Sequence, residues 1–487
     1  MPLAPAPIDL LPKHSLLLDG QWLSESSGGD MEHIYPATGK PTRRIALAGA
    51  REVDDAVRSC RAALPGWRAL PGARRRDLML RFADLLNRDA DMLVMLGACE
   101  NGVPIARGRL HFRGVVEQFR YVAGWADKHG GEVVPAGPMP GFSYVQPEPY
   151  GVVGLIIPWN APMHILGATL GPALAVGNTV VLKPSELAPF TGAKFGELLL
   201  EAGIPPGVVN IVTAGPAGSE ALVRHPGVDK IHFTGSGATA RKVLAGALEN
   251  LTPVGLELGG KSARLVFADA DMDVAVREAV SGALAMSGQG CLLGTRILVE
   301  EAVYPAFIER CAQVLRSVVV GDPMAERSQI GPVVGPTACK RILNTIEMAR
   351  VSGKARLVCG GERLGGDLAD GYFIQPALFA DVDNTADLAR NEIFGPVLAM
   401  MPFRSETEAL ALANDTSYGL AGYIHTNDLK RCHRVAAALE VGNVWINGFF
   451  FGATLPFGGV KQSGFGRTGG RQGLEEFSRV KNVWMPL

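Results

Sequence analysis

Hydrophobic and polar positions follow three successive patterns along the chain. From residue 52 to residue 100 apolar residues recur at helical spacing, with a break at Leu70-Pro71-Gly72, so amphipathic helices are expected on either side. From residue 130 to residue 149 the pattern becomes strand-like around a turn-rich centre at 135–141, which predicts a hairpin. An exposed hairpin of this kind either pairs with another subunit or packs against its own domain.

Beyond residue 150 short apolar runs alternate with segments of helical length. A first series of runs occupies 152–157, 179–182, 208–212 and 230–233, and a second occupies 263–267, 296–299, 355–358, 397–401 and 444–447. This alternation favours parallel sheets with crossover helices, and its two series predict two α/β domains. The tail ends in a strand-like segment, 480–484, that could extend the sheet of the hairpin.

Composition excludes several classes of protein. The chain has 487 residues, of which 47% are hydrophobic and 20% charged, and its formal net charge is -1. Such a balance gives no basic surface for nucleic acid or an anionic membrane. The seven cysteines are scattered without a Cys-x-x-Cys pair, which favours a reducing compartment and argues against a metal cluster. The N-terminal residues lack a secretory pattern and the most apolar segment, 151–158, is too short to span a bilayer, so a cytoplasmic location is expected.

Three residues could together carry out nucleophilic chemistry on a carbonyl group. Cys291 follows a glycine-rich segment, although a lone cysteine there is more often a small buried residue. Glu257 lies among apolar residues and glycines, where desolvation would raise its pKa towards that of a general base. Asn160 ends an apolar run with an amide that could donate to an oxyanion. None of the nine histidines lies in a recognisable thiol-partner motif, which argues against a cysteine hydrolase.

Two further segments could bind a nucleotide. Lys183 and Glu186 follow a predicted parallel strand, where they could hold the hydroxyls of a ribose. Gly235 and Ser236 lie between a predicted strand and a predicted helix, so backbone N–H groups there could face a pyrophosphate. The spacing is not the usual Gly-x-Gly-x-x-Gly. Each segment could equally be an ordinary surface turn.

Taken together, these motifs resemble those of the NAD(P)-dependent aldehyde dehydrogenase superfamily. The resemblance extends from residue 36 to the tail and rests on Pro158-Trp159-Asn160, Lys183-Pro184-Ser185-Glu186, Phe233-Thr234-Gly235-Ser236, Glu257-Leu258-Gly259-Gly260-Lys261, Gly288-Gln289-Gly290-Cys291, Glu392-Ile393-Phe394-Gly395-Pro396 and Pro456-Phe457-Gly458-Gly459.

The resemblance implies an α/β fold with two doubly wound parallel-sheet domains and a small β oligomerisation arm. The NAD-binding domain would comprise 1–127 and 148–256, and the catalytic domain 257–460. The arm and the C-terminal strand would comprise 128–147 and 461–487. A homodimer or a homotetramer is then expected.

The resemblance also implies a role for each motif. Cys291 would attack an aldehyde, Glu257 would activate water for hydrolysis of the thioester, and Asn160 with the N–H of Cys291 would hold the oxyanion. Retention of Glu257 argues against transfer of the acyl group to coenzyme A. NAD is the expected cofactor, and NADP remains possible. The predicted cofactor-binding residues are Ile156, Pro158, Trp159, Lys183, Ser185, Glu186, Gly215, Gly235, Ser236, Leu258, Glu392 and Phe394.

Departures from the family suggest a substrate class. Small or aliphatic residues occupy positions where enzymes for short aldehydes often have large aromatic ones, which predicts a wide, apolar funnel and a bulky apolar or aromatic aldehyde. The predicted lining residues are Ala161, His164, Ile165, Ala168, Leu292, Phe451 and Phe457. The alternatives are a semialdehyde dehydrogenase of amino-acid catabolism and a non-catalytic protein on the same fold. Arg479 occupies a position where many relatives carry an acid that assists proton release.

Overall fold

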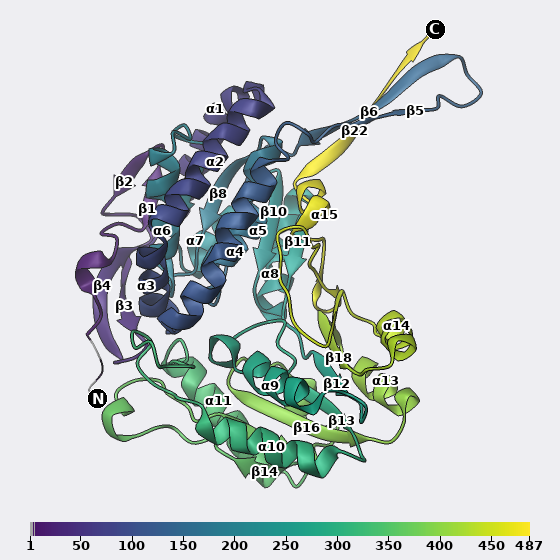
Figure 1. The fold of residues 1–487 in the computed structure, drawn as a ribbon. Helices are drawn as coiled ribbons and strands as arrows, with labels where there is room; N and C mark the ends of the chain where they lie inside the picture. Colours follow the sequence, from purple (N-terminus) through teal and green to yellow (C-terminus); the bar gives the residue numbers. More distant parts are fainter. Residues whose placement is uncertain (1–2, 4) are drawn as a thin grey trace.

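The first series of apolar runs forms the centre of an eight-stranded sheet (Figure 1). The structure is a computed structural model that describes residue 3 and residues 5–487. The strand order is β2-β1-β9-β8-β7-β10-β11-β21, and the five strands from β9 to β11 are parallel. These strands are β1 (Leu16–Leu18), β2 (Gln21–Leu23), β7 (Val152–Ile156), β8 (Thr179–Lys183), β9 (Val209–Val212), β10 (Lys230–Thr234), β11 (Val254–Glu257) and β21 (Gly464–Phe465).

Helices cover both faces of this sheet. Alternate residues of its strands point to opposite faces, and each set packs in its own apolar core. Val153 and Leu155 pack with residues of α2–α6, whereas Val152 and Ile156 pack with residues of α1, α7 and α8. The predicted break separates α1 from α2, since one helix ends at Ala69 and the next begins at Gly72. The helices are α1 (Ala50–Ala69), α2 (Gly72–Arg88), α3 (Ala90–Asn101), α4 (Ile105–Ala123), α5 (Pro162–Val176), α6 (Pro189–Glu201), α7 (Pro216–Val223) and α8 (Gly237–Ala247).

The second series of runs forms a seven-stranded sheet in the order β14-β15-β16-β13-β12-β18-β19. All its strands are parallel except the edge strand β14, which is antiparallel to β15. The strands are β12 (Ala263–Val266), β13 (Arg296–Glu300), β14 (Arg356–Cys359), β15 (Ala377–Ala380), β16 (Val397–Phe403), β18 (Ala421–His425) and β19 (Asn443–Ile446). The helices are α9 (Met272–Ala283), α10 (Tyr304–Ser317), α11 (Pro336–Val351), α12 (Asp387–Arg390), α13 (Glu406–Asn414) and α14 (Leu429–Ala438).

The predicted hairpin projects from the body of the molecule as an arm (Figure 1). It consists of β5 (Glu132–Val134) and β6 (Gly141–Pro149), and the C-terminal strand β22 (Ser478–Pro486) pairs along the whole of β6. The tail therefore extends the sheet of the hairpin, as the sequence indicated. The remaining elements are β3 (Asp30–Tyr35), β4 (Lys40–Ala46), β17 (Tyr418–Gly419), β20 (Val460–Lys461), α15 (Gly470–Glu475) and the 3-10 turns Ile8–Leu10, Leu248–Asn250, Ala285–Gly288 and Gly366–Leu368.

The predicted fold class is confirmed, and the domain boundaries remain predictions. Two segments lie in the first sheet although the predicted ranges assign them elsewhere. Glu257 is the last residue of β11, and Gly464–Phe465 forms β21 on the same edge. Gly464–Phe465 pairs antiparallel with Leu256 and Glu257 and is the outer neighbour of β11. None of the described helices combines the length and apolarity that a membrane span requires.

Candidate active site

The order of the parallel strands places several loops at one edge of the first sheet. The chain runs from β7 outward to β8 and β9, then returns to the other side of β7 as β10 and β11. The carboxyl ends of β7 and β10 therefore form a topological switch point, where open α/β sheets bind ligands. Four predicted site residues lie at or just after the carboxyl ends of β7, β8, β10 and β11. They are Pro158, Lys183, Gly235 and Glu257, respectively.

Cys291 follows a tightly held turn. Met286 and Ser287 have φ values of 50° and 57°, a left-handed conformation that residues other than glycine rarely adopt. The Ser287 hydroxyl offsets this strain because it donates to the Gly331 carbonyl at 2.9 Å and accepts from the Gly331 N–H at 3.1 Å. A Cβ on Gly288 would lie 2.2 Å from the Gly395 carbonyl carbon, so glycine serves close backbone packing at this position.

Asn160 connects the end of β7 to the segment that carries Cys291. Its side-chain Nδ2 donates to the Gln289 carbonyl at 2.9 Å, and the residue is 7% exposed. An amide nitrogen carries two hydrogens, so the second can donate to a substrate oxygen near Cys291. This geometry fits the predicted oxyanion-binding role.

Burial opposes the charged forms of both Cys291 and Glu257. It raises the pKa of the Cys291 thiol to about 12, and the negative charges of Glu392 and Glu257 add to the effect. It also raises the pKa of Glu257 well above its usual value; the Arg467 charge acts against this shift and the Glu476 charge adds to it. Both carboxyl oxygens of Glu257 lack a hydrogen-bond partner among the described residues. Burial therefore favours the protonated form of Glu257, and no hydrogen bond from the described residues fixes its carboxyl group.

Lys183 and Glu186 form a partly buried ion pair beyond β8. The Nζ of Lys183 lies 3.3 Å from Oε2 of Glu186, and the lysine is only 7% exposed. Burial lowers the pKa of Lys183 and the charge of Glu186 opposes that change. Next to them, the Ser185 hydroxyl accepts from the Leu187 N–H at 3.2 Å. The pair offers one donor and one acceptor to the hydroxyls of a ribose.

Three predicted residues lie at the N-termini of α7 and α8. Gly215 precedes α7 in open space, since the nearest atom to a Cβ there would be Leu47 Cδ1 at 4.0 Å. The Ser236 hydroxyl caps α8 by accepting from the Thr239 N–H at 3.2 Å. The Gly235 N–H bonds to the Glu257 carbonyl at 3.0 Å. The partial positive charge at these helix ends favours an anionic ligand.

Glu392 is held next to the Leu258–Lys261 segment by the backbone. Its Oε1 accepts from the Gly260 N–H at 3.1 Å, and a Cβ on Gly259 would lie 2.2 Å from its Oε2. Burial raises the pKa of Glu392 to about 7, while the positive charges of Lys261 and Arg341 oppose the shift. Only glycine at position 259 permits so close an approach.

Aromatic rings gather around the predicted cofactor and substrate residues. Trp159 and Phe394 meet edge to face with ring centroids 5.5 Å apart. The ring centroid of Phe451 lies 6.5 Å from that of His164 and 5.4 Å from that of Phe457, so these three predicted pocket residues are neighbours. Burial lowers the pKa of His164 to about 4, helped by the His111 charge. The imidazole is therefore neutral at pH 7.

The other predicted pocket residues lie on or next to α5 and in the segment after Cys291. Ala161 immediately precedes α5, and Ile165 and Ala168 lie on that helix. Ala168 borders a narrow gap that also contacts Ala453. The Leu292 carbonyl accepts from the Tyr423 hydroxyl at 2.9 Å, which orients the segment after Cys291.

Three other predicted residues have defined places. Ile156 is buried in β7, and the Leu258 N–H bonds to the Ser463 carbonyl at 3.0 Å. Arg479 lies in β22 of the arm, opposite Glu148 of β6. The charges acting on Glu257 come instead from Arg467 and Glu476.

Sequence reasoning missed two buried polar residues of the site. The Asn101 side chain donates to the carbonyls of Trp159 and Asn160 at 3.0 and 3.3 Å. Nothing in the sequence marks this contact, because Asn101 ends a helix far from both partners in the chain. Lys261 is 2% exposed, and its Nζ has no hydrogen-bond partner among the described residues. Its place in the Glu257–Lys261 motif was the available signal.

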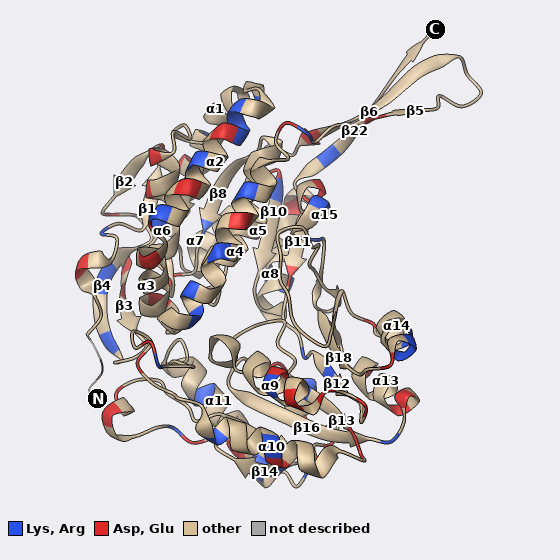
Figure 2. Cartoon of the chain, viewed as in Figure 1, with Lys and Arg blue, Asp and Glu red and all other residues tan. Residues whose placement is uncertain are grey.

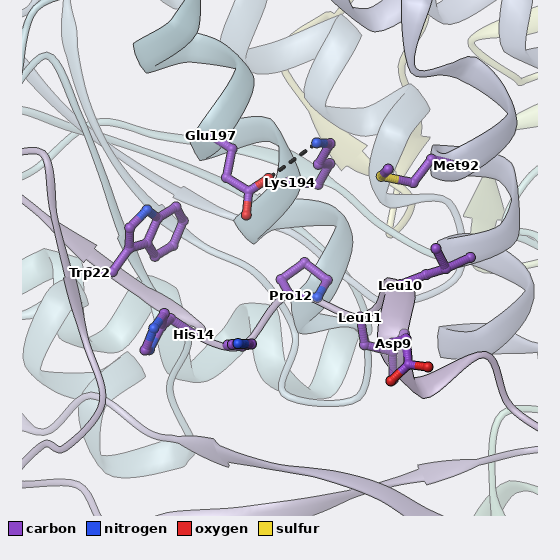
Figure 3. Close-up of a pocket in the computed structure, with 10 residues that line it drawn as sticks. Asp9, Leu10, Leu11, Pro12, His14, Trp22, Met92, Lys194 and Glu197 are labelled. Atoms are coloured by element: carbon purple, nitrogen blue, oxygen red, sulfur yellow. Dashed lines mark hydrogen bonds and ion pairs between the residues drawn. The ribbon is translucent and has the colours of Figure 1, made fainter.

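A surface pocket of about 370 Å³ lies elsewhere, between the N-terminal segment, α3 and α6 (Figure 3). Within it Lys194 pairs with Glu197 at 3.1 Å, and His14 stacks near Trp22. None of the predicted site residues lines this pocket. Among the described residues, no three His, Cys, Asp or Glu side chains are grouped so that they could hold a metal ion.

Comparisons with known proteins agree with this geometry. The sequence pattern of the "Aldehyde dehydrogenase family" matches residues 22–483. The chain is 41% identical to human mitochondrial aldehyde dehydrogenase over 479 residues, covering 96% of this chain and 91% of the relative.

Solved structures are similar over almost the whole chain. PnpE from Pseudomonas sp. WBC-3 has a TM-score of 0.95 at 37% identity and covers 97% of this chain and 98% of its own; another of its structures contains nicotinamide adenine dinucleotide. Betaine aldehyde dehydrogenase from Staphylococcus aureus in complex with NAD+ also has a TM-score of 0.95, at 31% identity, and covers 98% and 96%. This chain belongs to the aldehyde dehydrogenase family and is an NAD(P)-dependent oxidoreductase that acts on aldehydes.

Proposed function

We propose that this protein oxidises an aldehyde to a carboxylic acid through a thioester on Cys291, which is hydrolysed with Glu257 as base. The observation that carries the proposal is the state of Glu257. Its carboxyl group is buried and unpartnered among the described residues, and its charge acts on the Cys291 thiol. A structural carboxylate would be paired with hydrogen-bond donors.

Residues of this chain fit NAD as the cofactor. Lys183 and Glu186 offer a ribose contact, the N-termini of α7 and α8 suit a pyrophosphate, and Glu392 suits the second ribose. Gly215 leaves open space where a side chain would fill the approach to α7. When bound, NAD supplies a positively charged ring that accepts a hydride. The carboxylate of Glu186 favours NAD over NADP, whose 2′-phosphate it would repel.

The reaction has two stages, formation of the thioester and its hydrolysis, and different residues act in each. Cys291 Sγ bonds to the carbonyl carbon while the thiol proton passes to solvent water, and the amide of Asn160 with the Cys291 N–H donates to the resulting oxyanion. After oxidation the carbon is held as a thioester. Glu257 then takes a proton from water as the water oxygen attacks that carbon. The C–S bond breaks to release the acid, and the Cys291 sulfur takes the proton back from Glu257. The sum is aldehyde, NAD+ and water converted to acid, NADH and a proton.

The proposed substrate is a bulky apolar or aromatic aldehyde. His164, Phe451 and Phe457 are neighbours, and the low pKa of His164 leaves it uncharged at neutral pH. An uncharged aromatic wall favours an apolar substrate over a semialdehyde, which carries a carboxylate. Benzaldehyde should therefore have a higher kcat/KM than succinic semialdehyde. The reverse preference would contradict this choice.

The role of Glu257 is tested by trapping the thioester in Glu257→Gln. Because the proposal assigns Glu257 to deacylation, we expect one equivalent of NADH per active site in a burst, followed by turnover reduced about 10²- to 10⁴-fold. Intact-protein mass spectrometry should detect the acyl group on Cys291. In the wild type, kcat should rise with pH through the raised pKa of Glu257 if deacylation limits turnover.

Cys291→Ala is the companion variant. It should give no burst and no acyl group while its Kd for NAD stays the same. Wild-type turnover in Glu257→Gln would reject the base, and retained turnover in Cys291→Ala would reject the nucleophile.

A further inference from the structure

Asn101 occupies the junction between α3 and the loop that carries Asn160. It is 3% exposed, and its Nδ2 donates to the main-chain carbonyls of Trp159 and Asn160 at 3.0 and 3.3 Å. Its Oδ1 accepts from the Val103 N–H at 3.1 Å. All the hydrogen-bonding groups of this side chain are thus used to hold backbone, and both donor bonds act on the same short loop.

The Asn160 side chain continues the connection to the nucleophile. Its Nδ2 donates to the Gln289 carbonyl, and the Gln289 Oε1 accepts from the Val334 N–H at 2.9 Å. Two residues after Gln289 comes Cys291. A chain of hydrogen bonds therefore runs from α3, which covers the first sheet, to the segment before α11, a helix that packs against the second sheet.

The helix end that carries Asn101 is itself fixed. The carboxylate of Glu100 accepts from the Thr191 N–H at 2.8 Å and from the Thr191 hydroxyl at 2.5 Å. Gly102 has φ +77° and packs so closely that a Cβ on Gly331 would lie 2.0 Å from its carbonyl oxygen. Gly331 in turn holds Ser287 in the turn before Cys291. Asn101 is therefore a rigid anchor against which Asn160 can be oriented.

We propose that Asn101 is a positioning residue for the oxyanion-binding amide of Asn160. The inference rests on the proposed function, in which Asn160 donates to the oxyanion. Holding the Trp159 and Asn160 carbonyls fixes the backbone from which the Asn160 side chain extends, so its second N–H is directed where the oxyanion forms. Preorganised donors are effective because they need no reorientation during the reaction.

A double-mutant cycle tests the proposal. Asn101→Asp keeps the acceptor for Val103 but removes both donor bonds, and Asn101→Ala serves as a second variant without an added charge. Each should lower kcat/KM about 10- to 100-fold, the scale of a misplaced donor, with the Kd for NAD within about twofold of wild type. In an Asn160→Ala background the same changes should lower kcat/KM by less than about twofold, because Asn101 acts through Asn160.

Asn210→Asp is the matched control. Asn210 lies near the start of β9, outside the site, and is 0% exposed. It donates to the Ala56 and Gly207 carbonyls and accepts from the Asp19 N–H. It should lose thermal stability as Asn101→Asp does, yet keep kcat/KM within about twofold of wild type.

The results distinguish failure of the Asn101 role from failure of the oxyanion role of Asn160. An impaired Asn160→Ala with unimpaired Asn101 variants would overturn the inference alone. So would additive losses in the double variants, or an equal loss of kcat/KM in Asn210→Asp. Full activity of Asn160→Ala would overturn the oxyanion role and the inference with it.

Discussion

At the scale of single residues, the site brings together acidic groups that disfavour one another's ionisation. Cys291, Glu257 and Glu392 are close enough that each acid raises the pKa of the thiol, and burial raises all three. The sequence correctly predicted that Glu257 would be desolvated, from its apolar and glycine neighbours. Only the family resemblance placed Glu392 near this site, because no local pattern can connect two residues 135 positions apart.

The raised pKa of Glu392 predicts pH-dependent cofactor binding. A carboxylate accepts hydrogen bonds from ribose hydroxyls better than a neutral acid does, and the pKa of this group is about 7. Affinity for NAD should therefore rise as the pH rises through that value. The expected gain is up to about tenfold between about pH 6 and about pH 8, measured by fluorescence titration.

Glu392→Gln should bind NAD more weakly and with little change over that pH range. Glu197→Gln on the surface of α6 is the control and should keep the wild-type profile. An unchanged pH slope in Glu392→Gln would assign the dependence to another group.

At the scale of elements, apolar runs predicted the strands well and their ends less well. The runs 230–233 and 397–401 became Lys230–Thr234 and Val397–Phe403, since polar or exposed residues can also pair in a ladder. The pattern did not reveal that β14 is antiparallel, because direction depends on the connection and not on the strand itself. Nor did it predict β1 and β2, which have three residues each, or that β1 pairs with the distant strand β9.

The start of α1 depends on one buried acid. Glu52 accepts from the Ser27 N–H, the Ser27 hydroxyl and the Gly49 N–H, and it pairs with Arg51. Burial acts to raise its pKa, but these hydrogen bonds outweigh burial and lower the pKa to about 2. The stabilisation is therefore complete above about pH 4.5 and is lost as the pH falls towards about 2.

Glu52→Gln should lower the free energy of unfolding by about 1–3 kcal/mol at neutral pH, with a smaller difference from wild type near about pH 3. Thermal midpoints at both pH values measure this. The exposed Glu117→Gln serves as the control, with little change at either pH. A constant difference between Glu52→Gln and wild type across the range would show that ionisation of Glu52 does not contribute.

At the scale of the whole molecule, the arm is the feature whose role depends on a partner. The ribbon of its outer half is almost entirely tan in Figure 2, the colour of residues other than Lys, Arg, Asp and Glu, and residues 133–147 contain none of these four types. Val133 and Val480 are each 71% exposed, and Trp484 is 45% exposed. Exposed apolar strands of this length favour an interface, so the homodimer or homotetramer remains our prediction.

Val480→Glu on the arm should therefore shift the assembly towards monomer, because a buried, unpaired charge is costly at an interface. Sedimentation velocity would measure the shift. The control is Leu248→Glu, since Leu248 is 69% exposed beyond α8. An unchanged mass for Val480→Glu, or an equal change in the control, would contradict an interface at Val480.

The sequence by itself determined the two α/β sheets, the hairpin and the segments that carry Cys291, Glu257 and Asn160. It could do so because apolar periodicity and short motifs are local properties of the chain. Only the tertiary structure decided which groups meet: Asn160 bonds to Gln289 across 129 positions, and Asn101 reaches Trp159 across 58. Burial and opposing charges arise from such distant contacts, so the protonation states of the site follow from the fold.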